Sequence, residues 1–178
     1  YAPVREDDLA DYLSLGRWPM GRAGVIPVFY NGYRNNFDVA RPLLDRHGLV
    51  GWFMAVPGYS SATDQAGFAA TNRLVTVPGE YPDGRSALSW DELRALDGPH
   101  VVASHTRSHS RAGLDDPAAV ESEIVGAQED FRRGLGHPVR AFAWLHGGRY
   151  GENPVADRAV DRAGYQILFS NRAVQRLR

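Results

Sequence analysis

The stretch Val101-Val-Ala-Ser-His-Thr-Arg-Ser-His109 contains an apolar run followed directly by polar residues, a pattern that predicts the class of fold. A short apolar, β-branched run over 101–103 predicts a buried strand, and this strand leads directly into Ser104 and His105. In α/β proteins, ligands bind at the carboxyl ends of the strands. Polar residues that directly follow a strand are therefore the first candidates for a functional site.

The same alternation of apolar runs and helical segments extends in both directions from this stretch. Apolar runs predict further strands over 24–29, 49–56, 141–145 and 166–169, the last of which is expected to end the sheet. Helical periodicity and capping residues predict helices over 36–47, 89–96, 116–135 and 153–163, and 59–87 is expected to be a long loop with at most a short hairpin. Pro27 argues against a central ladder position for the first strand, and Pro57-Gly58 is expected to close the second as a turn. Strands that alternate with helices over short connections predict a parallel α/β sheet or barrel.

Composition excludes several classes of function. The chain has 178 residues, which predicts one domain, and its net charge of −1 provides no basic surface for nucleic acid. All 20 positive residues are Arg, so there is no lysine for a Schiff base or a P-loop, and no Cys for a thiolate site. No apolar run is long enough to span a membrane, and the first residues lack the layout of a signal peptide. The location stays open among the envelope, exterior and cytoplasm of a bacterium.

His105 and His109 are the strongest metal-binding candidates. They follow a predicted strand and are four residues apart, a spacing at which two imidazoles can share a divalent metal. Imidazole ligands favour zinc or a similar transition metal, with carboxylate or water completing the shell. The alternative is that both are ordinary polar loop residues.

The order of motifs resembles the polysaccharide deacetylase family, also called the NodB-homology domain or carbohydrate esterase family 4. The motifs that carry the resemblance are 28–34 (VFYNGYR), 104–109 (SHTRSH) and 141–147 (AFAWLHG), with shorter matches at 51–58, 89–93 and 163–165. The resemblance extends from Val25 to Asn171. It implies one domain over 1–178, in which 1–23 leads into a family region over 24–171. Whether other domains of a longer chain accompany it stays open.

The resemblance also implies a fold, an activity and a cofactor. The family fold is a distorted, incomplete (β/α) barrel, and its members remove acetyl groups from N-acetylated sugars with a metal-activated water. It implies an N-acetylated sugar or polysaccharide as partner, with one divalent metal, most readily zinc, on His105 and His109. Two consecutive aspartates follow the first strand in the family, as general base and third metal ligand. Here these positions are Tyr30 and Asn31, and neither is a carboxylate.

This replacement changes the expected chemistry. A phenol with a reference pKa of about 10 is a poor base at pH 7, and a positioned base is worth ~10²–10⁴ in rate. An Asn31 amide oxygen brings no charge to a dication, so metal affinity should fall or the metal be absent. The family's proline and arginine of the third motif are Leu145 and Ala143 here. The family also has a late histidine that protonates the leaving amine, and no histidine follows the last predicted strand here. His146 is the candidate substitute for that role, and a wall residue of the groove is its alternative role.

Two functions remain open. The first is a hydrolase with altered or reduced activity, whose base is Asp38, Asp83 or Glu152, or in which Tyr30 is an acid or hydrogen-bond donor. The second is a pseudoenzyme that serves as a glycan-binding or regulatory module. The residues expected to contact substrate are Tyr33, Arg34, Tyr59, Trp144 and Tyr150, of which the aromatic ones suit stacking on sugar rings. Barrel packing is the alternative role, above all for Trp144.

Overall fold

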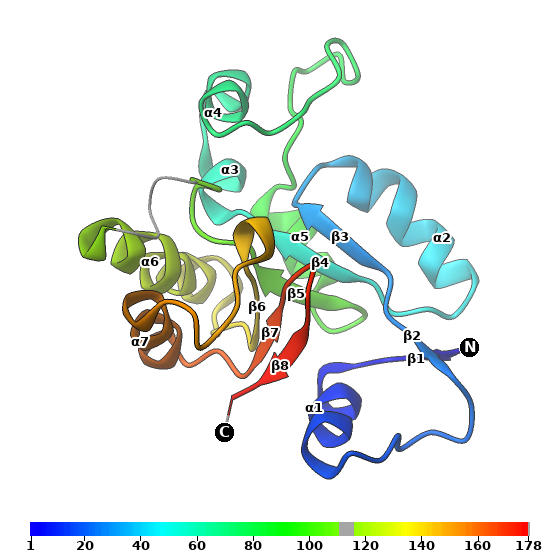
Figure 1. Ribbon diagram of the computed structural model, residues 1–178. Helices are drawn as coiled ribbons and strands as arrows, with labels where there is room; N and C mark the ends of the chain where they lie inside the picture. The colour runs from blue at the N-terminus through cyan, green and yellow to red at the C-terminus, as the bar shows by residue number, and fades with distance from the viewer. Residues whose placement is uncertain (111–115, 178) are drawn as a thin grey trace.

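A curved six-stranded sheet forms the centre of the molecule (Figure 1). The computed structural model describes residues 1–110 and 116–177. The strand order is β3 (Val28–Asn31), β4 (Trp52–Ala55), β5 (Val101–Ser104), β6 (Ala141–Ala143), β7 (Ile167–Phe169) and β8 (Val174–Arg176). Strands β3 to β7 are parallel, and β8 runs antiparallel to β7. An order that follows the chain without reversal is that of a barrel, and in the described residues β3 and β8 are unpaired edges, which confirms an incomplete (β/α) barrel.

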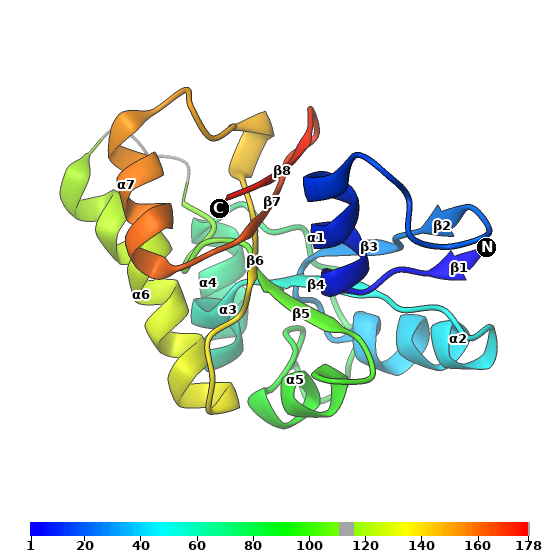
Figure 2. The same cartoon turned by 90° about the horizontal axis from the view of Figure 1, so that it is seen from below.

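Helices cover the outer, convex face of the sheet (Figure 2). They are α2 (Arg41–Arg46, which continues the π-helical turn η1, Asn36–Ala40), α5 (Trp90–Leu96), α6 (Pro117–Leu135) and α7 (Pro154–Ala163). Because side chains alternate along a strand, every second residue faces this layer. Phe53, Val102, Phe142 and Leu168 belong to this outer core together with the apolar faces of the helices.

The N-terminal helix α1 (Glu6–Leu15) fills the inner, concave face, inside the arc of the strands (Figure 2). Leu9 and Ala10 pack with the alternate strand residues that face inward, namely Trp52, Met54, Val101, Ala103, Ala141, Ala143, Ile167 and Phe169. The segment before α1 forms β1 (Ala2–Pro3), which pairs with β2 (Gly24–Val25). The Trp52 indole N–H donates to the Val4 carbonyl at 2.9 Å. Val4, Leu9 and Ala10 are therefore part of the barrel interior.

Helices α5, α6 and α7 begin at the capping residues from which they were predicted. The Ser89 hydroxyl accepts from the Glu92 N–H at 3.2 Å, and the Glu92 carboxylate accepts from the Ser89 N–H at 2.7 Å. Asp116 caps α6 by accepting from the Ala118 N–H, and Asn153 caps α7. None of the helices in the described ranges combines the length and apolarity needed to cross a bilayer.

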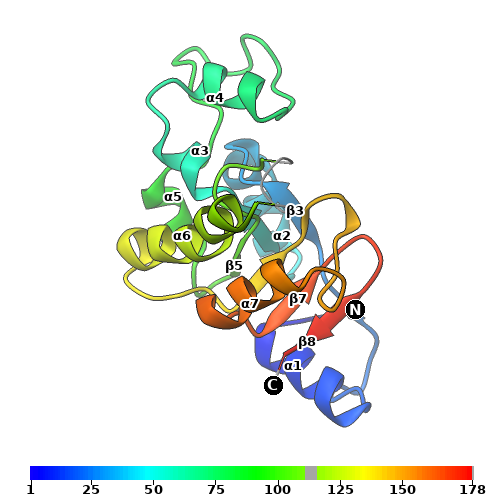
Figure 3. The same cartoon turned by 60° about the vertical axis from the view of Figure 1, so that its left-hand side comes forward.

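Several predicted boundaries are wrong. The strand expected over 24–29 is two strands, β2 and β3, because Pro27 interrupts the ladder. Pro57-Gly58 begins helix α3 (Pro57–Ser61) instead of closing a turn, since proline fits the first turn of a helix. The segment expected to be a loop over 59–87 contains α4 (Gln65–Thr71), which stands with α3 at one end of the molecule (Figure 3).

The remaining corrections concern the ends of strands. The strand expected over 49–56 is the shorter β4, and that over 141–145 is β6 followed by the 3-10 turn η3 (Leu145–Gly147). The strand over 166–169 is not the last one, because β8 follows it. The short strand β8 escaped prediction because its sequence, Val-Gln-Arg, contains no apolar run.

Candidate functional site

A cavity of about 240 Å³ opens at the carboxyl ends of β3, β5, β6 and β7. It is lined by Tyr30, His105, His109, Trp144, Leu145, His146 and Asn171. Five of these seven side chains are residues that the sequence singled out for catalysis, metal or substrate, so segments far apart in the chain meet at one place. Leu145 and Asn171 received no role from the sequence, although Asn171 follows β7 in the way the other site residues follow their strands.

His105 and His109 are held in one orientation by backbone carbonyl groups. Their ring centroids are 5.2 Å apart. Nδ1 of His105 lies 3.0 Å from the Ala143 carbonyl, and Nδ1 of His109 lies 3.1 Å from the Asn72 carbonyl. Because a carbonyl oxygen can only accept, each Nδ1 carries a proton, and this selects the tautomer in which the lone pair lies on Nε2. This arrangement is typical of metal-binding or hydrogen-bond-accepting histidines.

The backbone around the cavity is unusual. Among the described residues other than glycine, positive φ occurs at Asn31 (75°), Arg73 (58°), Thr106 (65°), His109 (61°) and His146 (52°). His109 and His146 line the cavity, Thr106 lies between the two cavity histidines, and Asn31 directly follows Tyr30. Left-handed backbone is uncommon outside glycine and clusters at functional sites, where the surroundings force it. The local strain therefore marks the same place as the cavity.

Tyr30 occupies the expected position at the cavity, whereas the Asn31 side chain is engaged elsewhere. The Tyr30 ring lies edge-on to His105, with centroids 5.1 Å apart. Burial raises the pKa of the Tyr30 phenol above its usual value, so the phenol stays protonated at neutral pH and can donate a hydrogen bond. The Asn31 amide donates to the Tyr33 hydroxyl at 3.3 Å, and Asn31 is not among the residues that line the cavity.

The donor set does not fit a resident divalent metal. Two oriented imidazoles are present, but within residues 1–110 and 116–177 no three His, Asp, Glu or Cys side chains are grouped to hold one ion. Catalytic zinc sites use three protein ligands. Asn31, the predicted third ligand, is neutral, and its amide nitrogen donates a hydrogen bond to the Tyr33 hydroxyl.

His146 and Trp144 line the cavity from the segment after β6. The His146 ring lies 6.3 Å from that of His109, so three imidazoles follow one another along the cavity. Trp144 is buried and packs edge-on against Phe142 at 5.1 Å, and it also belongs to the outer core. It thus forms a fixed wall.

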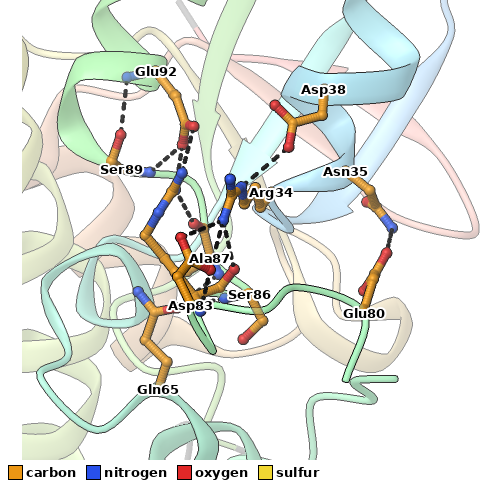
Figure 4. Close-up of polar contacts among 11 residues, drawn as sticks. Arg34, Asn35, Asp38, Gln65, Glu80, Asp83, Ser86, Ala87, Ser89 and Glu92 are labelled. Carbon is orange, nitrogen blue, oxygen red and sulfur yellow. Dashed lines mark hydrogen bonds and ion pairs between the residues drawn. The ribbon is translucent and has the colours of Figure 1, made fainter. Parts of the chain in front are cut away.

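Arg34 lies in a polar network that fastens the segment after α4 to the end of β3 (Figure 4), and Tyr33 contacts the same segment. The Arg34 guanidinium contacts Asp83 at 2.8 Å and Asp38 at 3.1 Å. The Tyr33 hydroxyl accepts from the Val75 N–H at 3.0 Å. Neither residue lines the cavity, and their contact with substrate stays a prediction.

Tyr59 and Tyr150 also lie outside the cavity lining. Tyr59 is fully buried, and its hydroxyl lies 2.5 Å from that of Ser86. The Tyr150 hydroxyl donates to the Asp161 carboxylate at 3.0 Å. Of the five residues predicted to contact substrate, Trp144 lines the cavity and the other four do not.

The three carboxylates considered as a replacement base are engaged in ion pairs. Asp38 and Asp83 both contact Arg34, and Glu152 contacts Arg172 at 2.8 Å. None of them lines the cavity, and its described lining contains no other carboxylate. The side chains at hand are therefore three imidazoles, a phenol, an indole, an amide and the aliphatic side chain of Leu145.

Burial of His105 predicts a pH-dependent stability. The ring is 5% exposed, and burial lowers its pKa to about 4. The unfolded chain protonates this histidine as pH falls through about 6.5, while the folded chain resists until about 4. We expect His105 to account for a loss of about 2 to 3 kcal/mol in unfolding free energy between pH 7.5 and 4.5.

Urea unfolding at the two pH values measures this effect. The pH-dependent loss should shrink by that amount in His105→Gln and stay unchanged in His47→Gln, whose side chain is exposed. An equal loss in His105→Gln and in the unchanged chain would contradict the assignment.

Known proteins share this sequence pattern and fold. The model of the polysaccharide deacetylase family matches residues 20–168. No curated protein sequence matches the chain. Among solved structures, the deacetylase PplD of Streptococcus pyogenes, determined in complex with acetate, superposes with a TM-score of 0.72 at 14% identity, over 93% of this chain and 63% of that one. This chain therefore spans less than two thirds of that relative.

Two further structures show the same fold. The BpsB deacetylase domain from Bordetella bronchiseptica gives a TM-score of 0.69 at 17% identity, covering 94% of this chain and 71% of that one. IcaB from Ammonifex degensii gives 0.66 at 19% identity, covering 94% and 68%. The family model covers well over half of the sequence, and the chain belongs to the polysaccharide deacetylase family.

Proposed function

We propose that this domain binds an N-acetylated carbohydrate in the cavity at the ends of β3, β5, β6 and β7 and does not carry out metal-dependent deacetylation. The observation that carries the proposal is the lining of that cavity. It keeps two imidazoles with fixed orientation but, among the described residues, presents no carboxylate. A carboxylate base and a charged third metal ligand are the two parts of the family reaction that the described lining does not supply.

The chemistry of the lining supports a neutral, hydroxyl-bearing and amide-bearing ligand. Tyr30 presents a protonated phenol, His105 and His109 keep acceptor nitrogens, and the Asn171 amide offers both a donor and an acceptor. Trp144 adds an apolar wall. The cavity of about 240 Å³ is smaller than the ~300–1,000 Å³ of sites for drug-sized ligands, which suits one sugar unit or its acetamido group.

The second candidate is a zinc-dependent hydrolase. It is supported by the Nδ1 anchors of His105 and His109, because ligand histidines commonly donate their other N–H to a carbonyl group. Against it stands the missing third ligand, since two neutral imidazoles leave a dication without compensating charge. Metal content and acetate release separate the two functions.

Calorimetry with N-acetylglucosamine oligosaccharides tests the proposal. We expect binding that survives a chelator, that is at least 10-fold tighter than for the matched glucosamine oligosaccharides, and that releases no acetate. Tyr30→Phe removes one hydrogen bond and should weaken binding roughly 10-fold, about 1.4 kcal/mol. Tyr12→Phe, on the exposed face of α1, is the matched control.

Each other outcome has a definite meaning. Stoichiometric zinc, loss of binding in chelator and release of acetate would establish the hydrolase. Equal affinity for both oligosaccharides, or binding to neither, would overturn the proposed ligand class.

A further inference from the structure

Two carboxylates on α6 are buried outside the cavity. Glu123 is 8% exposed and Asp130 is 6% exposed, whereas Glu129 on the same helix is exposed. Buried carboxylates are rare unless they are paired or hydrogen-bonded. Both contact one segment, the loop 105–109 between the two cavity histidines.

Glu123 accepts hydrogen bonds from the two central residues of this loop, Arg107 and Ser108. Its carboxylate accepts from the Ser108 N–H at 2.9 Å and from the Ser108 hydroxyl at 2.5 Å. Its backbone carbonyl accepts from the Arg107 N–H at 2.9 Å. One residue of α6 therefore accepts from three donors of the loop, namely the Arg107 N–H, the Ser108 N–H and the Ser108 hydroxyl.

Asp130 and Gly58 hold the loop from two further sides. Asp130 accepts from Arg107 Nε at 2.8 Å and from Arg107 Nη2 at 3.3 Å. The Gly58 N–H donates to the Arg107 carbonyl at 2.9 Å, and a Cβ at Gly58 would lie 2.5 Å from that oxygen. The path of the loop is thus fixed by contacts that do not involve the cavity.

The loop needs this support because its backbone is strained. Thr106 has φ 65° and His109 has φ 61°, and neither is glycine. Such residues persist only where the surroundings determine their conformation. Inside the loop, the Thr106 hydroxyl accepts from the His109 N–H at 3.1 Å, but this bond alone does not set the direction of the loop.

We infer that Glu123, assisted by Asp130, is a positioning residue that holds the loop 105–109 so that His109 faces the cavity and keeps its Nδ1 on the Asn72 carbonyl. The role of the cavity as a ligand site rests on the proposed function, while the control of the His109 ring does not. The alternative is a carboxylate that only secures the packing of α6.

NMR of the histidine side chains at pH 7.5 distinguishes these roles. The unchanged chain should show His109 as a single tautomer protonated at Nδ1. In Glu123→Ala, we expect the His109 signals to shift and to report both tautomers, while His105, anchored on Ala143, is unchanged. Glu123→Gln keeps an acceptor for the Ser108 N–H and should restore the single tautomer in large part. Glu129→Ala removes a carboxylate from the exposed face of α6 and should change nothing.

Ligand binding provides the second readout. Affinity for the N-acetylglucosamine oligosaccharide should fall at least 10-fold in Glu123→Ala and stay unchanged in Glu129→Ala. If the unchanged chain binds no oligosaccharide, the proposed function fails, and the NMR result still decides the positioning role.

A fallback covers loss of folding. If Glu123→Ala does not fold, Ser108→Ala removes one of the two donors to the carboxylate and should give a smaller shift of His109 in the same direction. A folded variant, either Glu123→Ala with a lowered melting temperature or Ser108→Ala, whose His109 signals match the unchanged chain would overturn the inference.

Discussion

Changing Tyr30 and Asn31 together to aspartate is expected to raise acetate release from N-acetylglucosamine oligosaccharides at least ~100-fold over the unchanged chain. Asn31→Asp replaces the amide that donates to the Tyr33 hydroxyl with a carboxylate that cannot donate there, so the side chain is free to turn toward the two imidazoles, whose Nδ1 protons are already anchored. In that orientation it completes the two-histidine, one-carboxylate set of catalytic zinc sites. Aspartate tolerates the φ of 75° at this position nearly as well as asparagine. Tyr30→Asp adds a base at the cavity.

The two single variants separate the contribution of the metal ligand from that of the base to the increased acetate release. Asn31→Asp alone should bind zinc stoichiometrically but release little acetate, and Tyr30→Asp alone should do neither. His105→Ala in the double variant should abolish both zinc binding and activity. If the unchanged chain already releases acetate as fast as the double variant, the two positions do not limit the reaction and the proposed loss of activity is wrong.

The parts of the fold that the sequence predicted well are those with a local physical signal. Helices α5, α6 and α7 begin at Ser89, Asp116 and Asn153, whose side chains cap them, and a cap is readable from a few neighbouring residues. The strands β4 to β7 are short apolar runs buried on both faces. Their order in the sheet follows from the repeated strand and helix pattern.

The parts that the sequence missed depend on distant contacts. Strand β8 is polar and exists because it pairs with β7. Helix α4 lies in a segment without clear periodicity, and its Gln65 side chain accepts from the Ser86 and Ala87 N–H groups. These distant contacts leave no mark in the local sequence, whereas the Asp64 cap of α4, which accepts from the Gly67 N–H, is a local signal that the prediction overlooked.

The candidate site shows the same division. His105, His109, Tyr30, Trp144 and His146 meet at one cavity, as their positions after strands predicted. The anchors of the two imidazoles could not be read in the same way, because backbone carbonyls of Asn72 and Ala143 carry no residue-specific signal. The contribution of Glu123 was also hidden, since it lies on a helix face rather than after a strand.

Leu9→Ala is expected to destabilise the domain by about 2 to 5 kcal/mol, which lowers the melting temperature by roughly 5 to 15 °C. Leu9 is 5% exposed on α1, and it packs into the inner core among the inward-facing side chains of β4 to β7. An incomplete barrel leaves this face without further strands to cover it. The helix thus replaces the missing part of the barrel, and truncating Leu9 opens a cavity in the centre of the sheet.

Leu15 provides the matched control, because it lies on the same helix and is 66% exposed. Leu15→Ala should change the unfolding free energy by less than about 0.5 kcal/mol. Thermal unfolding followed by circular dichroism measures both variants.

If both variants lose the same small amount of unfolding free energy, α1 only rests against the sheet and the inner core does not depend on it. A large loss confined to Leu9→Ala would instead make the N-terminal helix a structural part of the domain, although it lies before residue 20, where the family match begins. The polar contacts of α1, from Asp7 to Arg140 and from the Ala10 carbonyl to Arg176, favour the second outcome, since they join the helix to the residue before β6 and to β8.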